Sequence, residues 1–154
     1  MTAGPDHPEG DLRITTDPAE LDLDWLVPAL SERAYWALGR SRSVIEQSIA
    51  GSLVFSALLD GRQVGFARVV TDQATFAWIC DVFVDESARG RGVGKRLMAA
   101  IVHDPRLGGL NRMMLATQDA HGLYARFGFE PLGQPEKWMV RPAPRPSPGT
   151  DGDA

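Results

Sequence analysis

The sequence predicts a single α/β domain, with about four helices flanking a mixed, mostly antiparallel central sheet. The chain has 154 residues, of which 44% are hydrophobic, enough for one core but too few for two ordinary domains. Apolar residues recur at helical spacing before residue 50, and β-branched and aromatic runs dominate soon after it. The segments follow the order β-α-α-β-β-β-α-β-α-β, which is typical of a sheet covered by helices.

The N-terminal part predicts one short strand and two helices. Residues 12–16 have strand character, and Asp17 is placed to cap a first helix. Ser43 and Glu46 form a capping box that predicts a second helix. Residues 31–40 join the two helices and are rich in aromatic and cationic side chains. Each helix carries one apolar face, so both are expected to pack on the sheet.

From residue 53 the pattern predicts strands. Residues 53–60 and 62–70 flank the turn signal Asp60-Gly61, which together predict a β-hairpin. Residues 76–85, with the sequence FAWICDVFVD, are long and rich in aromatic and β-branched side chains. This segment is therefore predicted to be a central strand.

The C-terminal part predicts two more helices and two more strands. A glycine-rich turn leads into residues 93–101, whose apolar side chains share one helical face. Residues 111–117 are predicted to form a strand and residues 120–127 a short helix. Residues 128–140 are predicted to contain a final strand region.

Composition excludes several function classes. A net charge of −4 argues against a general nucleic-acid binder, which needs a strong excess of Lys and Arg on one face. Cys80 is the only cysteine, which rules out an internal disulfide and a cysteine-based zinc cluster. The three histidines lack ligand-like spacing, so no metal is expected.

The ends of the chain differ in composition from its middle. Residues 1–11 and 142–154 are rich in Pro and Gly and poor in apolar side chains, so we expect a disordered leader and a disordered tail around a folded domain of residues 12–141. We find no basic segment followed by an apolar run, and no apolar stretch as long as a membrane span. The expected location is therefore the cytoplasm, without membrane contact.

The strongest chemical signal is the glycine-rich turn of residues 89–95, with the sequence RGRGVGK. Its three glycines leave backbone N–H groups accessible, and the helix that follows has no Ser, Thr, Asp or Asn to cap its first donors. Arg89, Arg91 and Lys95 add positive charge at the same point. A turn of this kind between a strand and a helix is suited to bind a diphosphate.

Two other phosphate-binding motifs do not fit this turn. The dinucleotide motif G-x-G-x-x-G fails because Leu97 stands where its third glycine belongs. The P-loop motif G-x-x-x-x-G-K-[ST] fails because Arg89 occupies its first position and Arg96 its last. A flexible glycine loop with solvated arginines is the remaining alternative, and the strand-to-helix context disfavours it.

Two motifs together resemble the GNAT family of N-acetyltransferases. Residues 89–94 resemble the family signature R/Q-x-x-G-x-G/A, with Arg89, Gly92 and Gly94 at the signature positions. Residues 120–129, AHGLYARFGF, resemble the family block A-x-x-L-Y-x-x-x-G-F in the correct order. The resemblance covers nearly the whole predicted domain and implies the acyl-CoA N-acyltransferase fold.

The resemblance also implies a cosubstrate and the residues that bind it. The turn would hold the pyrophosphate of acetyl-coenzyme A, and the backbone of the predicted central strand would pair with the pantetheine arm and donate an N–H group to the thioester oxygen. Tyr124 would lie near the sulfur and protonate the leaving thiolate. Thr117 stands where many members carry Asn, so its contact is less well defined by the family. The implied cofactor-binding residues are Val82, Phe83, Val84, Arg89, Gly90, Arg91, Gly92, Val93, Gly94, Lys95, Thr117 and Tyr124.

Asp81 is a carboxylate within an apolar run. If burial raises its pKa, it can accept the amine proton or orient the ammonium, and the alternative is a hydrogen-bonded structural aspartate. In a regular strand, Cys80 would point to the opposite face as a buried core thiol. Tyr35, Trp36 and Arg40 lie where the resemblance places the acceptor pocket, or else they are ordinary core and surface residues.

The predicted function is transfer of acetyl from acetyl-coenzyme A to a primary amine of a small molecule by direct attack, with Tyr124 and Asp81 as the candidate catalytic residues. A non-catalytic acyl-coenzyme A sensor and an acetyltransferase acting on protein N-termini or lysines stay open. The sequence predicts no nucleic-acid partner. Dimers are common in the family, so a homodimer is also open.

Overall fold

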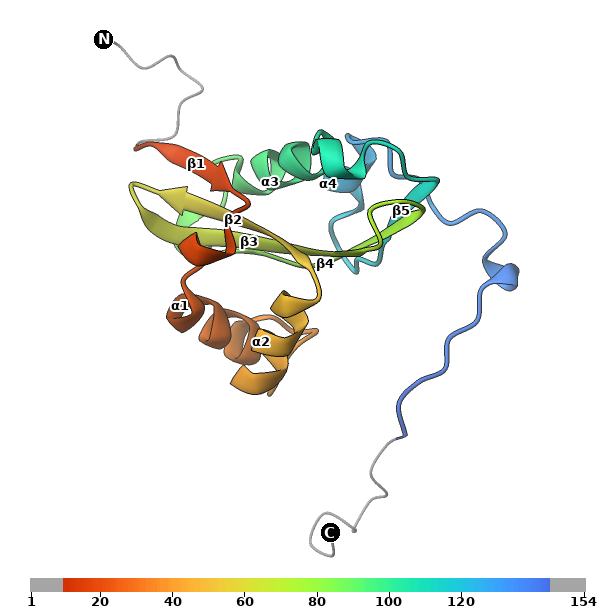
Figure 1. The fold of residues 1–154 in the computed structure, drawn as a ribbon, viewed down its shortest axis with the longest axis horizontal. Coiled ribbons are helices and arrows are strands. Elements are labelled where there is room, and N and C mark those ends of the chain that lie inside the picture. The colour runs from red at the N-terminus through yellow and green to blue at the C-terminus, as the bar shows by residue number, and fades with distance from the viewer. Residues whose placement is uncertain (1–9, 145–154) are drawn as a thin grey trace, which may run out of the picture.

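The computed structural model describes residues 10–144 and contains one five-stranded sheet between two layers of helices (Figure 1). The first four strands pair antiparallel in chain order, and the fifth pairs parallel with the fourth. The prediction of a mixed, mostly antiparallel sheet is therefore confirmed. The strands are β1 (Leu12–Thr15), β2 (Leu53–Leu59), β3 (Arg62–Thr71), β4 (Phe76–Val84) and β5 (Arg112–Leu115).

In the described part of the chain, four α-helices cover the sheet, two on each face (Figure 1). Helices α1 (Leu23–Pro28) and α2 (Arg42–Ala50) lie on one face, and α3 (Val93–Val102) and α4 (His121–Ala125) lie on the other. Each face has its own hydrophobic core. The core under α1 and α2 contains Leu26, Leu30, Ile45, Val54, Phe66 and Phe83. The core under α3 and α4 contains Phe55, Val69, Ile79, Leu97, Met98 and Ile101, among others.

Both N-terminal helices begin at residues that differ from the predicted ones. The Asp17 side chain accepts a hydrogen bond at the start of the short 3₁₀ turn Pro18–Glu20. Helix α1 begins after this turn, and its cap is Asp22, whose side chain accepts a hydrogen bond from the Trp25 N–H at 3.2 Å. Helix α2 is capped by Ser41 rather than Ser43. Ser41 has the extended backbone of a residue that precedes a helix, and its side chain accepts a hydrogen bond from the Val44 N–H. The sequence predicted both helices correctly and missed their caps.

The predicted hairpin is present and carries the expected turn. Asp60 and Gly61 join β2 to β3 with φ values of 51° and 81°, the left-handed pair that two-residue hairpins require. The Asp11 backbone N–H donates to the Asp60 side chain at 2.9 Å, and the Asp60 backbone N–H donates to the Asp11 carbonyl at 3.0 Å. The last residue of the predicted leader is thus attached to the hairpin, while residues 1–9 and 145–154 lie outside the described part of the chain.

Strand β4 contains a bulge at Asp81. Arg68 of β3 pairs with Cys80 and Phe66 pairs with Phe83, so β4 has one residue more than β3 over this stretch. Asp81 absorbs the extra residue with φ of 54°, a conformation that Asp adopts more readily than most residues. The bulge reverses the side-chain alternation, because Ile79 packs under α3 whereas Phe83 packs under α1 and α2.

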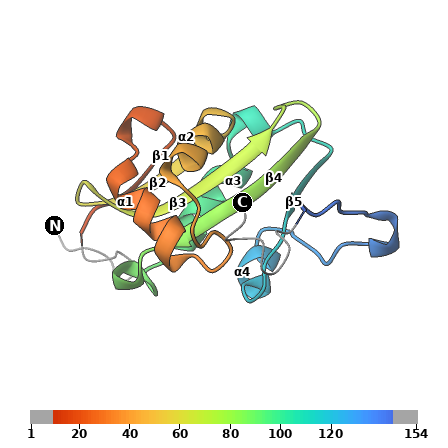
Figure 2. The ribbon, with the colours of Figure 1, turned by 90° about the horizontal axis from the view of Figure 1, so that it is seen from below.

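The final strand predicted between residues 128 and 140 is wrong for this structure. Among residues 116–144 the chain forms α4 and a 3₁₀ turn at Pro135–Lys137, and no strand. Pro131 and Pro135 lack the N–H group that a ladder needs, and Gln134 has φ of 55°. Residues 134–144, which we call the C-terminal arm, extend away from the body beyond β5 (Figures 1 and 2).

Two structural features are absent from residues 10–144. No helix in this range has the length and apolar character that crossing a bilayer requires. The same range contains no group of three or more His, Cys, Asp or Glu side chains arranged to hold a metal ion.

Candidate active site

The glycine-rich turn lies where β4 leads into α3 on the second face of the sheet (Figure 1). Gly90 and Gly92 have φ of 81° and 77°, values that favour glycine. Apart from chain neighbours, a Cβ at either position would meet no atom within 4 Å. Gly92 is the N-cap of α3 and no side chain caps the helix. The first N–H groups of a ten-residue helix therefore face an open turn without an intrahelical partner.

Cationic side chains surround this turn. Arg89, Arg91 and Lys95 are exposed, and the Arg89 Nε group donates to the Val84 carbonyl at 3.2 Å. The Arg89 guanidinium also lies 6.0 Å from the centre of the Phe83 ring. Arg89 is thus held against the end of β4, with its charge beside the start of α3.

Strands β4 and β5 separate close to the turn. Their parallel pairing ends at Ile79 and Leu115, although β4 continues to Val84. The edge of β4 that faces β5 therefore has no strand partner over residues 80–84 among the described residues. Backbone N–H and C=O groups on such an edge are available to an extended ligand.

Tyr124 lies in α4, beside this separation. It is buried to 8% exposure and packs edge-to-face on Phe129, with ring centres 6.2 Å apart. Its hydroxyl has no hydrogen-bond partner within residues 10–144, and the ring lines the cavity described below. Burial raises the pKa of the Tyr124 phenol above its ordinary value, and the negative charge of Asp119 raises it further. The phenol is therefore protonated at neutral pH and able to donate.

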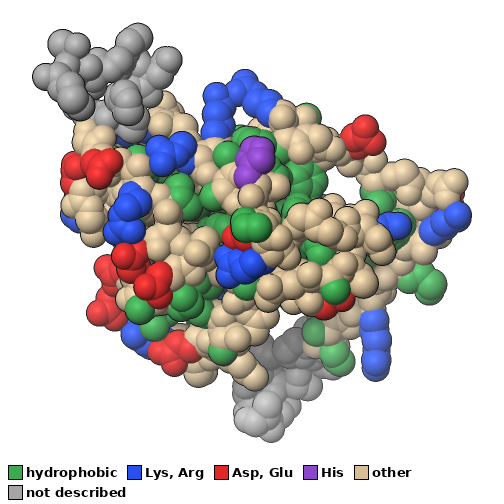
Figure 3. Space-filling model, turned by 45° about the horizontal axis from the view of Figure 1, so that its top comes forward, with side chains coloured by type: hydrophobic (Ala, Val, Ile, Leu, Met, Phe, Trp, Pro, Cys, Tyr) green, Lys and Arg blue, Asp and Glu red, His purple; other side chains and the backbone are tan. Residues whose placement is uncertain are grey.

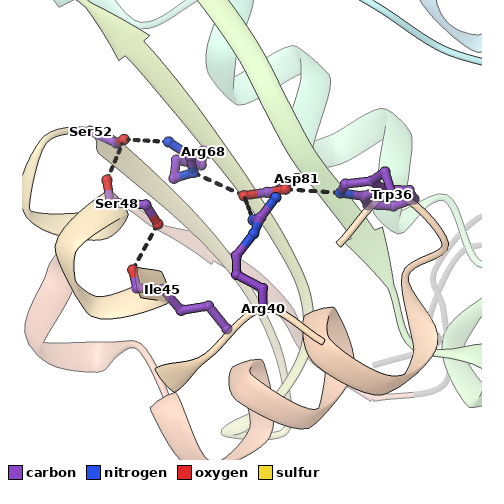
Figure 4. Close-up of polar contacts among 7 residues, drawn as sticks. All are labelled: Trp36, Arg40, Ile45, Ser48, Ser52, Arg68 and Asp81. Carbon is purple, nitrogen blue, oxygen red and sulfur yellow. Dashed lines mark hydrogen bonds and ion pairs between the residues drawn. The ribbon is translucent and has the colours of Figure 1, made fainter. Parts of the chain in front are cut away.

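Asp81 lies at the centre of a polar network on the other side of the cavity (Figure 4). Its side chain is 2% exposed. The indole N–H of Trp36 donates to Oδ1 at 2.8 Å, and Arg40 and Arg68 donate to Oδ2 at 2.8 and 3.0 Å. Arg68 also donates to the Ser52 hydroxyl at 3.1 Å. With both oxygens engaged and two cations beside it, Asp81 has the surroundings of a structural anchor.

These groups enclose a cavity of about 370 Å³ that opens beside β4. Its volume falls in the range of small-molecule sites. Aromatic side chains on one side face the end of β5 and the start of α4 on the other. The residues lining it include Tyr35, Trp36, Arg40, Arg68, Trp78, Cys80, Asp81, Thr117, Asp119 and Tyr124.

The connection between α1 and α2 supplies the aromatic wall. Ala34 and Ala37 are buried, and the Gly39 N–H donates to the Ser31 carbonyl at 2.9 Å. This closed loop holds Tyr35 and Trp36 outward, at 53% and 41% exposure and with their rings 4.9 Å apart. The predicted pocket residues therefore meet in one cavity.

Sequence reasoning missed one member of this site and misplaced another. Arg68 was missed because it stands in an apolar strand and pairs with Asp81 only across the sheet; a cation within the run GFARVV was the available signal. The expectation that Cys80 is a core thiol is wrong, because its side chain alternates with the buried Ile79 and lies half-buried on the cavity wall. Burial still raises the pKa of its thiol.

Thr117 lies on the cavity wall with its hydroxyl oxygen accepting from the Ala120 N–H at 3.0 Å. This bond holds the turn that begins α4. The hydroxyl hydrogen can still donate to a ligand.

Known proteins are similar to this chain in sequence and in structure. Residues 18–129 match the model of the acetyltransferase (GNAT) family. A Gibberella zeae protein that is provisionally named an acetyltransferase is 31% identical over 139 residues, which cover 76% of this chain and 77% of that protein. A Xanthomonas campestris pv. campestris structure, provisionally assigned to the GNAT family, is 45% identical with a TM-score of 0.85, covering 90% of this chain and 96% of that chain. The structure of Neisseria gonorrhoeae N-acetylglutamate synthase with coenzyme A and N-acetyl-glutamate has a TM-score of 0.65 at 22% identity, covering 84% of this chain and 30% of that chain.

Proposed function

The chain belongs to the acetyltransferase (GNAT) family, and we propose that it transfers the acetyl group of acetyl-coenzyme A to a primary amine of a small molecule by direct attack. Acetyl transfer is the chemistry of its family, and its sheet and helices have the fold of that family. The cosubstrate and the acceptor are our proposals. The observation that carries them is the uncapped start of α3 behind two left-handed glycines.

The glycine turn suits the pyrophosphate of coenzyme A. The N–H groups at the start of α3 would donate to its oxygens, and Arg89, Arg91 and Lys95 would balance its charge. Gly94 lies beside α4, the helix that carries Tyr124, because a Cβ at Gly94 would lie 3.5 Å from Leu123. A pyrophosphate bound at the turn would therefore lie near that helix. A coenzyme A complex in the fold-related N-acetylglutamate synthase also supports the choice of cosubstrate.

The unpaired edge of β4 suits the pantetheine arm. An extended amide chain could replace the missing strand partner beyond Ile79, in the gap that β5 leaves. The N–H groups of Val82, Phe83 and Val84 are the candidates to stabilise the thioester oxygen as charge develops on it. A donor in such a position typically contributes 10²- to 10³-fold to turnover. Acetyl-coenzyme A itself supplies the activated acyl group.

Tyr124 is the proposed general acid. It would donate its phenolic proton to the thiolate as the carbon–sulfur bond breaks, and the proton lost by the attacking amine would restore the phenol through solvent. The raised pKa of its phenol keeps that proton in place across the neutral range. Its hydroxyl also lacks a competing partner among the described residues.

The acceptor amine would bind in the 370 Å³ cavity, between Tyr35 and Trp36 on one side and Tyr124 on the other. We propose that Asp81 holds Trp36 and Arg40 in place as an anchor of this wall, in preference to acting as the base. Asp81 cancels one of the two positive charges of Arg40 and Arg68, and Asp119 lines the cavity on the side of Tyr124. The positive charge left on the side of Arg40 and Arg68 suits an acceptor that carries a carboxylate.

A thiol-release assay with acetyl-coenzyme A tests the proposal. The panel would pair small amines with and without a carboxylate, and would add peptides with a free N-terminus. Release above the rate of cosubstrate hydrolysis, greatest for small carboxylated amines, is the expected result. Release with peptides alone would move the acceptor to proteins. Calorimetric binding of acetyl-coenzyme A without turnover on any acceptor would favour the sensor, and absence of both would overturn the proposal.

A further inference from the structure

The cavity of about 370 Å³ beside β4, which we call the acceptor cavity, is lined by opposite charges on its two sides. We propose that Asp119 binds the ammonium group of a free amino acid with an aromatic side chain, whose carboxylate binds Arg40 and Arg68. This assignment rests on the proposed function, because it names the acceptor of that reaction. It also adds Asp119 to the residues that determine which amines are acetylated.

Asp119 supplies the negative charge of the acceptor cavity. It lies between β5 and α4, lines the cavity, and is close enough to Tyr124 for its charge to raise the pKa of that phenol. The only other carboxylate among the described lining residues is Asp81, and both of its oxygens already accept hydrogen bonds. Within residues 10–144, by contrast, no side chain or backbone group bonds the Asp119 carboxylate. Asp119 can therefore accept a charge-assisted hydrogen bond from an ammonium without giving up a contact of the fold.

Arg40 and Arg68 supply the positive charge on the other side. Arg40 donates to Asp81 through Nη1, and Arg68 donates to Asp81 through Nε and to Ser52 through Nη1 (Figure 4). Among residues 10–144, the Nη2 group of each arginine and the Nε group of Arg40 have no acceptor. A guanidinium presents its N–H groups in a planar fork that matches a carboxylate. Asp81 therefore holds both guanidinium groups in place and leaves donors for an incoming carboxylate.

The separation of charge inside the acceptor cavity contrasts with the surface. Cationic and acidic side chains are mixed over the face of the molecule that Figure 3 shows. Inside the cavity, a simple amine would leave one charge of Arg40 and Arg68 uncompensated, and a simple carboxylate would face Asp119 without a cation between them. A zwitterionic amino acid satisfies both sides at once, so the cavity selects it over either.

The direction of this charge separation also suits the reaction. An ammonium at Asp119 places the acceptor nitrogen beside Tyr124, the proposed general acid, and directs the carboxylate toward Arg40 and Arg68. After the nitrogen loses one proton to solvent, it bonds the acetyl carbon while the carbon–sulfur bond breaks and the thiolate takes the Tyr124 proton. The nitrogen then loses a second proton, which restores the phenol through solvent. The product is a neutral amide that Asp119 no longer attracts, which favours its release.

Aromatic rings indicate the side chain of the acceptor. Tyr35, Trp36 and Trp78 line the cavity, and the rings of Tyr35 and Trp36 lie edge to face with their centres 4.9 Å apart. The Trp36 indole N–H is bonded to Asp81, so this ring is held in place before an acceptor binds. Aromatic rings pack favourably on one another. Phenylalanine combines the ammonium, the carboxylate and the aromatic ring for which the cavity provides partners.

Steady-state kinetics with phenylalanine and with phenylethylamine, which lacks only the carboxylate, separate the two charged sides. Asp119→Asn should raise KM for both acceptors about tenfold or more, because both carry the ammonium. Arg40→Lys keeps a cation beside Asp81 but removes the planar fork, so it should raise KM for phenylalanine alone. Glu32→Gln is the matched control: Glu32 is an exposed carboxylate outside the cavity, and its substitution should leave both KM values unchanged.

In the wild type, KM should be about tenfold lower for phenylalanine than for phenylethylamine. Equal KM values for the two acceptors, or an unchanged KM in Asp119→Asn, would overturn the acceptor assignment and leave acetyl transfer itself in place.

Calorimetric titration of phenylalanine into the protein with coenzyme A present tests the same assignment without turnover. The Kd for phenylalanine should rise about tenfold or more in Asp119→Asn, and an unchanged Kd for coenzyme A would show that the variant is folded. Phenylalanine binding that depends on Asp119, in a protein without acetyl transfer, would overturn the proposed function alone. A wild type that transfers acetyl to other amines but does not bind phenylalanine would overturn the acceptor assignment alone.

Discussion

Three donors converge on the carboxylate of Asp81, and two of them are guanidinium groups. We predict that Asp81→Asn lowers the free energy of unfolding by about 3 kcal/mol, because it leaves Arg40 and Arg68 partly buried without a counterion. Urea denaturation measures this loss. Asn tolerates the left-handed backbone of this position as well as Asp does, so strain does not confuse the result. Normal stability with abolished turnover would instead identify Asp81 as a base.

Tyr124 provides a second prediction at the level of a single side chain. Tyr124→Phe should lower kcat by about 10²-fold and leave the Kd for acetyl-coenzyme A within about twofold, because only the proton donor is lost. Steady-state kinetics and calorimetry measure the two quantities. Tyr35→Phe is the control: it removes a hydroxyl from the same cavity without removing the proposed acid. Equal losses of turnover and affinity would make Tyr124 a binding residue.

At the level of elements, the start of α3 depends on glycine at one position. Gly92→Val should weaken acetyl-coenzyme A binding at least tenfold, because its side chain would cover the free N–H groups of the turn. It should also destabilise the fold by about 1–2 kcal/mol, since valine disfavours a φ of 77°. Calorimetry and thermal unfolding measure the two effects.

Gly109→Val is the control for this variant. Gly109 lies in open space, away from the turn, and its substitution should leave cosubstrate binding unchanged. Unchanged affinity in Gly92→Val would contradict the assignment of the turn to the pyrophosphate.

The packing of α3 on the sheet depends on a second glycine. A Cβ at Gly65 of β3 would lie 2.9 Å from Val93, 3.1 Å from Ala57 and 3.3 Å from Leu97. Gly65→Ala should therefore destabilise the protein by about 1–3 kcal/mol through overpacking, and should weaken cosubstrate binding by displacing the start of α3. Chemical denaturation of this variant beside Gly109→Ala checks the prediction. Equal stability of the two variants would show that α3 can shift without strain.

At the level of the whole molecule, the stability of the protein should depend on pH through Asp104. Hydrogen bonds from Arg106 hold the pKa of this carboxyl below its usual value. Its stabilising contribution is therefore complete above the unfolded pKa, near 4, and is lost as the pH falls through the lower folded value. Asp104→Asn should cost about 1 kcal/mol at pH 7, and the difference from wild type should shrink below about pH 4. Urea unfolding at several pH values measures it, and a constant difference would contradict the assignment.

Local features of the sequence were enough to predict most of the fold. The hairpin turn at Asp60-Gly61, the strand β4 and the glycine turn before α3 each depend on residues close together in the chain, and each is where the sequence places it. Composition shows that the connection before α2 is rich in aromatic and cationic side chains, and the family resemblance places Tyr35, Trp36 and Arg40 at a pocket. These residues do line one cavity with Tyr124.

Most of the features that were missed depend on residues far apart in the sequence. The bulge in β4 is defined by its register with β3, which no local pattern reports. Arg68 reaches Asp81 across that same pair of strands. Residues 128–140 contain apolar residues typical of a strand, but Pro131, Pro135 and a left-handed Gln134 turn the chain away from the sheet. The bulge and the Arg68 contact are decided between two strands, whereas the missing strand is decided by local backbone conformation.

The bulge in β4 reverses which side chains face the cavity, so it defines the positions at which mutations can broaden the range of acceptors. Trp78 and Cys80 reach the cavity from the stretch before the reversal, while Ala77 and Ile79, which alternate with them, are buried in the core. A combinatorial library at positions 78 and 80 would reshape the cavity while keeping that core intact. Randomising 77 and 79 would yield mostly misfolded clones.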